Sequence, residues 1–142
     1  MQTCPKIRIE FAALGRVSVN IALVKIRTEK YSAIPGEPAS NFVEILERLW
    51  WKLDAALSKD DVLLSAQIPL IECIRNGTTT VIDHHASPGY RDGSLDLIET
   101  AVRQAGIRAS LCYEVSDRNI MGGGVAENER FIKKIGKGDG QI

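Results

Sequence analysis

The chain has 142 residues, about the length of one domain, and its 44% hydrophobic and 25% charged residues are typical of a globular protein. Its formal net charge is zero, which gives no reason to expect nucleic acid or an anionic membrane as a partner. Its apolar stretches are too short to span a bilayer, and its three scattered cysteines indicate reduced thiols in a cytoplasmic protein rather than a disulfide framework.

Residues 1–34 are basic and difficult to assign to a fold. Two stretches within them, KIRIEF and RVSVNIALVKI, partly alternate apolar with polar residues, which suits β-strands. A basic β-hairpin and a poorly ordered tail are both consistent with this pattern. Pro35 and Pro38 then exclude regular structure and mark a linker. We therefore treat residues 1–34 as an unrelated or poorly ordered N-terminal segment.

Asn41 begins the first clearly predicted helix. Glu44 follows three residues later, which is the spacing of a helix N-cap and its reciprocal partner. Apolar residues then recur with a helical period: Phe42, Ile45, Leu46, Leu49, Leu53 and Leu57. Because Trp50 and Trp51 are neighbours, we expect one to pack inward and the other to cover an adjacent element. We interpret both as core residues rather than as a ligand platform.

A second helix is predicted from Ser58, with Asp61 as its capping partner. It continues through VLLSAQIPLIECIR and ends at residues 76–77 (Asn-Gly), where glycine permits a left-handed cap. Pro69 lies in its middle and predicts either a kink or a fresh first turn. Cys73 in this helix and Cys112 further on are interpreted as small buried apolar residues.

Two parallel strands are predicted, near residues 78–83 and 107–113, joined by a helix near residues 94–105. The first strand is almost entirely β-branched and lacks alternation, so we expect it to be covered on both faces. The intervening stretch HHASPGYRDG is predicted to be a loop. Residues 122–124 (Gly-Gly-Gly) are interpreted as a flexible connector, because they lack the pattern of a phosphate-binding loop. A last helix, VAENERFIKKI, should direct Phe131 and Ile132 inward.

Polar side chains collect after both strands, at the edge where parallel sheets bind ligands. Our substrate-facing candidates are Asp83, His84 and His85 after the first strand and Glu114 after the second, and Ser116, Asp117 and Arg118 follow Glu114.

Adjacent residues of an extended chain point to opposite sides, so the two histidines could not easily bind one ion. The alternative is that they are loop histidines with structural hydrogen bonds. Asp83 could orient a histidine or cap the loop. We assign no catalytic residue and no metal ligand.

Four stretches resemble, in order, the amidohydrolase superfamily: NFVEILERLWWKLDAAL, LIECIRNGTTTVIDHHASP, AGIRASLCYEVSDRN and GVAENERFI. Within it, they are most similar to the aminohydrolase and chlorohydrolase branch and its SsnA-type aminohydrolases. The resemblance covers about residues 31–135. It implies an α/β fold, a (β/α)8 TIM-type barrel. It also implies a divalent metal, zinc or iron, that activates water against a small-molecule substrate. Residues 35–142 would then be early βα units of that barrel.

The resemblance fails at both ends of the chain. In the family, a His-x-His pair precedes a segment like residues 31–33 (Tyr-Ser-Ala), but residues 27–29 here are Arg-Thr-Glu. The family's later metal ligands would also fall beyond residue 142. We therefore expect a partial barrel, incomplete at the C-terminus and atypical at the N-terminus.

Such a chain would be a fragment of a metal-dependent hydrolase acting on non-peptide C–N bonds, inactive alone and without a metal or cofactor of its own. The alternatives are a noncatalytic binding or assembly module that reuses the fold, and a piece completed by a partner chain. Exposed barrel edges would favour self-association.

Overall fold

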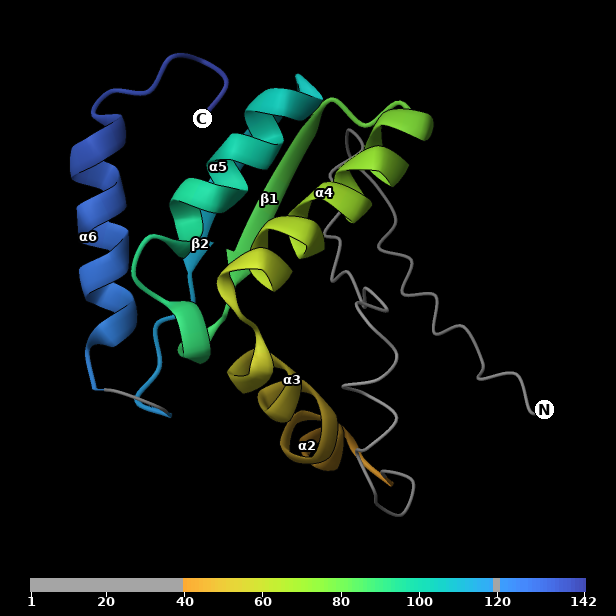
Figure 1. Ribbon diagram of the computed structural model, residues 1–142, viewed down its shortest axis with the longest axis vertical. Helices are drawn as coiled ribbons and strands as arrows, with labels where there is room; N and C mark the ends of the chain where they lie inside the picture. The colour runs from red at the N-terminus through yellow and green to blue at the C-terminus, as the bar shows by residue number, and fades with distance from the viewer. Residues whose placement is uncertain (1–39, 119–120) are drawn as a thin grey trace.

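The computed structural model describes residues 40–118 and 121–142, shown in colour in Figure 1. The predictions for residues 1–34 and for the prolines after them lie outside this range. In chain order the elements are α2 (Phe42–Ile45), the π-helix η1 (Leu46–Trp50), α3 (Trp51–Ala56), α4 (Lys59–Arg75), β1 (Thr80–His85), the 3-10 helix η2 (Pro88–Tyr90), α5 (Ser94–Ala105), β2 (Arg108–Tyr113) and α6 (Gly123–Ile135). None of these helices is both long enough and apolar enough to cross a bilayer.

β1 and β2 form a two-stranded parallel sheet with α5 between them in the chain, which confirms the predicted mixed α/β unit. The register pairs Thr80 with Arg108 at one end and His85 with Tyr113 at the other. β1 therefore includes both histidines, and their predicted place in a loop is wrong. The hydrogen-bond ladder extends this far because the Glu114 N–H donates to the His85 carbonyl at 2.7 Å.

The two faces of the sheet differ in how well they are covered. Val81, Ala109 and Tyr113 are buried on one face, whereas Ile82 is 51% exposed on the other. The prediction that β1 is covered on both faces is therefore wrong for the described residues. The β-branched composition of β1 reflects strand preference in general, which does not require double cover.

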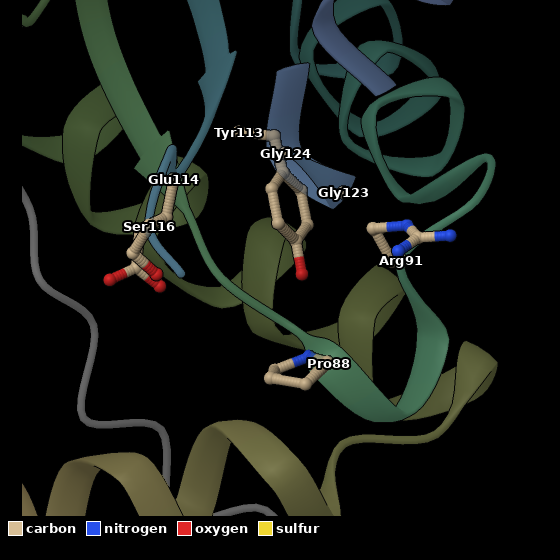
Figure 2. Close-up of a pocket in the computed structure, with 7 residues that line it drawn as sticks. All are labelled: Pro88, Arg91, Tyr113, Glu114, Ser116, Gly123 and Gly124. Carbon is tan, nitrogen blue, oxygen red and sulfur yellow. The ribbon is translucent and has the colours of Figure 1, made fainter. Parts of the chain in front are cut away.

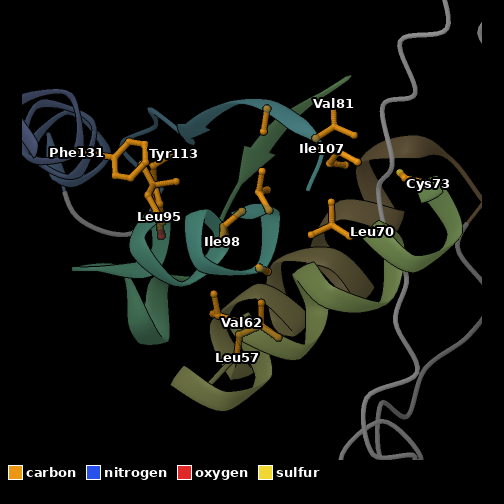
Figure 3. Close-up of a cluster of buried hydrophobic side chains, with 13 residues drawn as sticks. Leu57, Val62, Leu70, Cys73, Val81, Leu95, Ile98, Ile107, Tyr113 and Phe131 are labelled. Carbon is orange, nitrogen blue, oxygen red and sulfur yellow. The ribbon is translucent and has the colours of Figure 1, made fainter. Parts of the chain in front are cut away.

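The hydrophobic core lies between the sheet and α5, and α4 packs against α5 (Figure 3). Leu95, Ile98 and Val102 line the face of α5 that is buried in this core. Cys73 of α4 is buried there too, as predicted. α4 runs through Pro69 as one element, so this proline does not mark a fresh first turn.

The predicted helix caps are present. The Glu44 N–H donates to Asn41 Oδ1 at 3.0 Å, and the Glu44 carboxylate accepts from the Ser40 N–H at 2.8 Å, one residue earlier than expected. At the start of α4, the Asp61 carboxylate accepts from the Ser58 N–H at 3.0 Å and from the Ser58 hydroxyl at 2.6 Å. The bond from the Glu44 N–H satisfies a donor that the first helical turn leaves without a partner, and the bonds from Ser40 and Ser58 tie the residues before each helix to its first turn.

The first predicted helix is divided into α2, η1 and α3, and none of these three segments contains a buried residue. Trp50 packs edge-to-face against Phe42, with ring centroids 5.9 Å apart. Trp51 is 36% exposed and lies under the guanidinium of Arg118. Their predicted place in the core is therefore wrong.

α6 begins with buried glycines rather than with a flexible connector. A Cβ on Gly124 would lie 1.9 Å from the carbonyl oxygen of Glu114, so the helix and the end of β2 approach each other backbone to backbone. Phe131 is buried as predicted, but Ile132 is 65% exposed. The helix presents a single face to β2, and Ile132 lies outside that face.

Glu127 of α6 has a fully buried side chain that holds the N-terminus of α5. Its carboxylate accepts from the Gly93 N–H at 3.2 Å and from the Leu95 N–H at 3.3 Å. The Arg130 guanidinium donates to it twice, each time at 2.8 Å. The buried negative charge is thereby paired with a cation and with helix N–H donors, which carry partial positive charge.

Asn128, the next residue, occupies part of the outer edge of β2. Its Oδ1 accepts from the Tyr113 N–H and its Nδ2 donates to the Tyr113 carbonyl, both at 2.9 Å. At the other end of this edge, the Ala109 N–H donates to the Gln141 carbonyl at 2.8 Å. Gln141 therefore lies where a further strand of the sheet would begin.

Candidate functional site

The carboxyl ends of β1 and β2 meet at one edge of the sheet, with η2 beside them and α3 next to η2 (Figure 1). The four residues selected from the sequence all lie there. Asp83, His84 and His85 are the last residues of β1, and Glu114 directly follows β2. Parallel strands joined by a helix bring their carboxyl ends together, so this placement follows from the topology.

His85 is a structural residue that holds the loop between β1 and α5. Its Nε2 lies 2.8 Å from Ser87 Oγ, and this hydroxyl donates to the Tyr90 carbonyl at 2.7 Å. Because the hydroxyl has only one hydrogen, the imidazole must donate, which places its proton on Nε2. The ring also packs edge-to-face against Tyr113, whose hydroxyl accepts from the Ser87 N–H at 3.0 Å.

His84 faces the opposite way, toward the open side of the sheet, and is exposed. Its register partner is Cys112, whose thiol donates to the Asp83 carbonyl at 3.4 Å. The expectation that the two histidines point to opposite sides is thus met. Among residues 40–118 and 121–142, no group of three or more histidines, cysteines or carboxylates is arranged to hold a metal ion.

Burial changes the acid–base behaviour of both neighbours of His84. It raises the pKa of Asp83 to about 6, although the adjacent His84 acts to lower it. Burial lowers the pKa of His85 to about 4, which outweighs the opposing attraction of Glu127. His85 is therefore neutral at pH 7, in agreement with its role as a hydrogen-bond donor.

Protonation of His85 should lower the free energy of unfolding as the pH falls. Its pKa is about 4 when folded and 6.5 when unfolded, so the unfolded chain takes up the proton first. The contribution of neutral His85 to the free energy of unfolding is complete above pH 6.5. It is lost progressively toward pH 4, by up to about 3 kcal/mol. Urea unfolding of the native chain and of His85→Gln should show a stability gap that narrows over this interval.

Comparison with a variant removes the contributions of other groups, such as Asp83, that titrate in the same range. His84→Gln is the matched control, because the exposed His84 is not part of the Ser87 network. Its stability gap to the native chain should change less over this pH interval than the gap of His85→Gln, because the imidazole of His84 makes no hydrogen bond in that network. A pH-independent gap for His85→Gln would contradict the assignment.

Glu114 is engaged by Arg118, four residues later. The Arg118 Nη2 donates to the Glu114 carboxylate at 2.6 Å and lies 3.4 Å from the Asp54 carboxylate. The guanidinium carbon is 4.9 Å from the centroid of the Trp51 ring, a cation–π distance. Burial raises the pKa of Asp54 to about 6, despite the lowering effect of Arg118. No sequence pattern links Asp54 or Trp51 to this site, because they lie far from Arg118 along the chain.

A pocket of about 140 Å³ opens beside Glu114 (Figure 2). It is lined by Pro88, Arg91, Tyr113, Glu114, Ser116, Gly123 and Gly124. The Arg91 guanidinium lies directly over Gly123, where a Cβ would be 2.4 Å from its Nη1. Sites for whole drug-sized molecules are usually at least about 300 Å³, so this pocket has room for one polar group of a ligand. Arg91 was missed in the sequence, where nothing distinguishes it from a surface arginine.

The chain is similar to two deaminases over part of its length. It is 37% identical over 67 residues to 5-methylthioadenosine/S-adenosylhomocysteine deaminase of Moorella thermoacetica, a match of 47% of this chain and 14% of that protein. It is also 37% identical over 67 residues to 5'-deoxyadenosine deaminase of Methanoregula boonei, with the same coverage of 47% and 14%. The matched stretch is thus a small part of each relative.

No family model and no solved structure matches the chain. Both relatives are deaminases by name, and deaminases are typical members of the amidohydrolase superfamily. The comparison therefore agrees with the resemblance found in the sequence at the level of the superfamily.

Proposed function

We propose that the chain is part of a metal-dependent (β/α)8 hydrolase of the aminohydrolase and chlorohydrolase branch, SsnA-type in sequence, that acts on non-peptide C–N bonds. The observation that carries this proposal is the 37% identity to two deaminases over 67 residues. On its own, the chain is inactive.

The geometry of residues 40–118 and 121–142 supports early βα units of a barrel. β1 and β2 are parallel, and the connecting helix α5 covers one face. The other face, which carries Ile82 and His84, is open, as the interior side of an unfinished barrel would be. Gln141 lies on the outer edge of β2, where a third parallel strand would start.

A divalent metal in the complete enzyme would supply an activated water for attack on the substrate carbon. The described residues do not fit such a metal by themselves. His84 and His85 point to opposite faces, and a catalytic zinc needs at least about three convergent protein ligands. The ligands would therefore come from other strands, and the part we assign to His84 is to face the substrate.

The isolated chain should neither bind zinc tightly nor release ammonia. Zinc titration by calorimetry should give no one-to-one binding below about 1 μM, because too few ligands converge. Incubation with 5′-deoxyadenosine and zinc should release no ammonia. Tight binding abolished by His84→Ala or His85→Ala would contradict this expectation.

The activity itself can be tested in a chimera. The segment of this chain from β1 to α6 would replace the corresponding βα units of the Moorella thermoacetica deaminase. Retained metal-dependent ammonia release would support the proposal, and His84→Ala in the chimera should lower kcat/KM without lowering Tm. A well-folded chimera that binds metal but releases no ammonia would argue instead for a noncatalytic module.

A further inference from the structure

The helical segment from Phe42 to Ala56, here called the strap, lies next to the edge that carries the candidate site. In Figure 1 it occupies the lower end of the molecule, beyond the carboxyl ends of both strands. None of its three elements contributes a buried residue, and Phe42 and Val43 are 62% and 56% exposed. A segment with so little buried apolar surface should open more readily than the core helices.

Within the described residues, the strap contacts the rest of the structure through its C-terminal half. Leu57, just beyond it, is buried in the core. The backbone of Gly89 lies against the strap's last turn, where a Cβ would be 2.7 Å from the Ala55 carbonyl oxygen. The Arg118 guanidinium stacks on Trp51 at 4.9 Å and pairs with Asp54 at 3.4 Å. In α2, Phe42 packs on Trp50 and Glu44 pairs with Arg48, and both of these contacts lie within the strap.

The same guanidinium binds the candidate site. Arg118 Nη2 lies 2.6 Å from the Glu114 carboxylate, and Glu114 lines the pocket shown in Figure 2. The Arg118 side chain is 16% exposed, so water screens these contacts less than it would at the surface. Arg118 thus connects the strap to Glu114 and holds the Glu114 carboxylate in an ion pair.

The strap also contains an element suited to bending. η1, five residues long, separates α2 from α3 with π-helical hydrogen bonds. Such short π segments are rare within helices and are frequent at functional sites. Movement about η1 displaces α2 alone, whereas movement of α3, which carries Trp51 and Asp54, turns about the extended backbone of Leu57.

We propose that the strap is a lid over the candidate site and that Arg118 is its latch. In the closed state the guanidinium lies between Trp51 and Asp54 of the strap and Glu114 at the end of β2. Release of the guanidinium lets the strap open and frees the Glu114 carboxylate at the end of β2. This inference concerns the edge of the sheet and does not depend on C–N hydrolysis.

Hydrogen exchange measured by mass spectrometry on the whole chain tests the latch. In Arg118→Gln, amides of the strap should exchange about tenfold faster, since loss of the latch contacts favours local opening. Amides of α5 and β2 should keep their native rates. Arg75→Gln is the matched control, because Arg75 pairs with Glu72 on the exposed surface of α4, and it should leave strap exchange unchanged.

Asp54→Asn provides a second variant that stays informative if Arg118→Gln fails to fold. It keeps the size of the side chain and removes the charge that faces Arg118, so the strap should again exchange faster, by a smaller factor. Native exchange rates in the strap of a folded variant would overturn the proposal. An increase spread equally over α5 and β2 would also overturn it, because that pattern reports global destabilisation.

Discussion

Replacing Glu127 with alanine should lower the free energy of unfolding by about 2–4 kcal/mol, because its buried hydrogen-bond partners would be left unsatisfied. The side chain is fully buried and accepts hydrogen bonds from the Gly93 and Leu95 N–H groups. Alanine would leave these donors at the start of α5 without an acceptor and would remove one of the two carboxylates that pair with Arg130, the other being Asp96. Denaturation by urea, followed by circular dichroism, measures the loss.

Glu129→Ala is the matched control for this experiment, because Glu129 lies on the same helix and is exposed. Its unfolding free energy should stay within about 0.5 kcal/mol of the native value. Equal effects of the two substitutions would mean that the carboxylate of Glu127 does not hold α5 in place.

Gly124→Ala should destabilise the protein by about 2–3 kcal/mol, as overpacking in a core does. The added Cβ would lie 1.9 Å from the Glu114 carbonyl oxygen and 2.9 Å from its carbon, so the backbone of α6 or of the segment after β2 must move. Alanine gains about 1 kcal/mol of helix propensity over glycine, which offsets only part of this effect. Thermal unfolding should show a lower Tm.

Gly123→Ala is the control that distinguishes a collision with the backbone from the general effect of replacing a glycine. The atom nearest its new Cβ would be Nη1 of Arg91, the end of a flexible side chain that can rotate away. We expect a markedly smaller loss of stability than for Gly124→Ala. If the two alanine variants lose the same stability, the contact between α6 and Glu114 does not explain the glycine.

The sheet and its connecting helix could be predicted from local patterns. α5 spans Ser94–Ala105 as predicted, because an amphipathic run ends at Gly106, which adopts the left-handed cap. The caps at Asn41 and Ser58 were also readable, since capping depends on residues three apart. β1 was placed two residues early because its end is set by pairing with β2, which no pattern within β1 reports.

The candidate site was predicted less completely than the fold. Its strand residues follow from topology, and the spacing of Glu114 and Arg118 is close enough to suggest a pair. Asp54 and Trp51 reach Arg118 only through the packing of the strap against the sheet edge. The opposite roles of His84 and His85 depend on which face α5 covers, and the π-helical turn at η1 has no recognised signature in the chain.

The pairing of Asn128 with Tyr113 has a consequence for aggregation. Exposed strand edges act as templates on which other chains add strands. On the outer edge of β2, the side-chain amide of Asn128 hydrogen-bonds to the backbone N–H and carbonyl of Tyr113. The Gln141 carbonyl accepts a hydrogen bond from the N–H of Ala109. Leu111 is left between them, and one residue is too short a template for a stable added strand. The outer surface of α4 exposes four apolar side chains, Leu64, Ile68, Ile71 and Ile74. If copies of the chain associate, we therefore expect them to meet through β1 or through this surface of α4 rather than through β2.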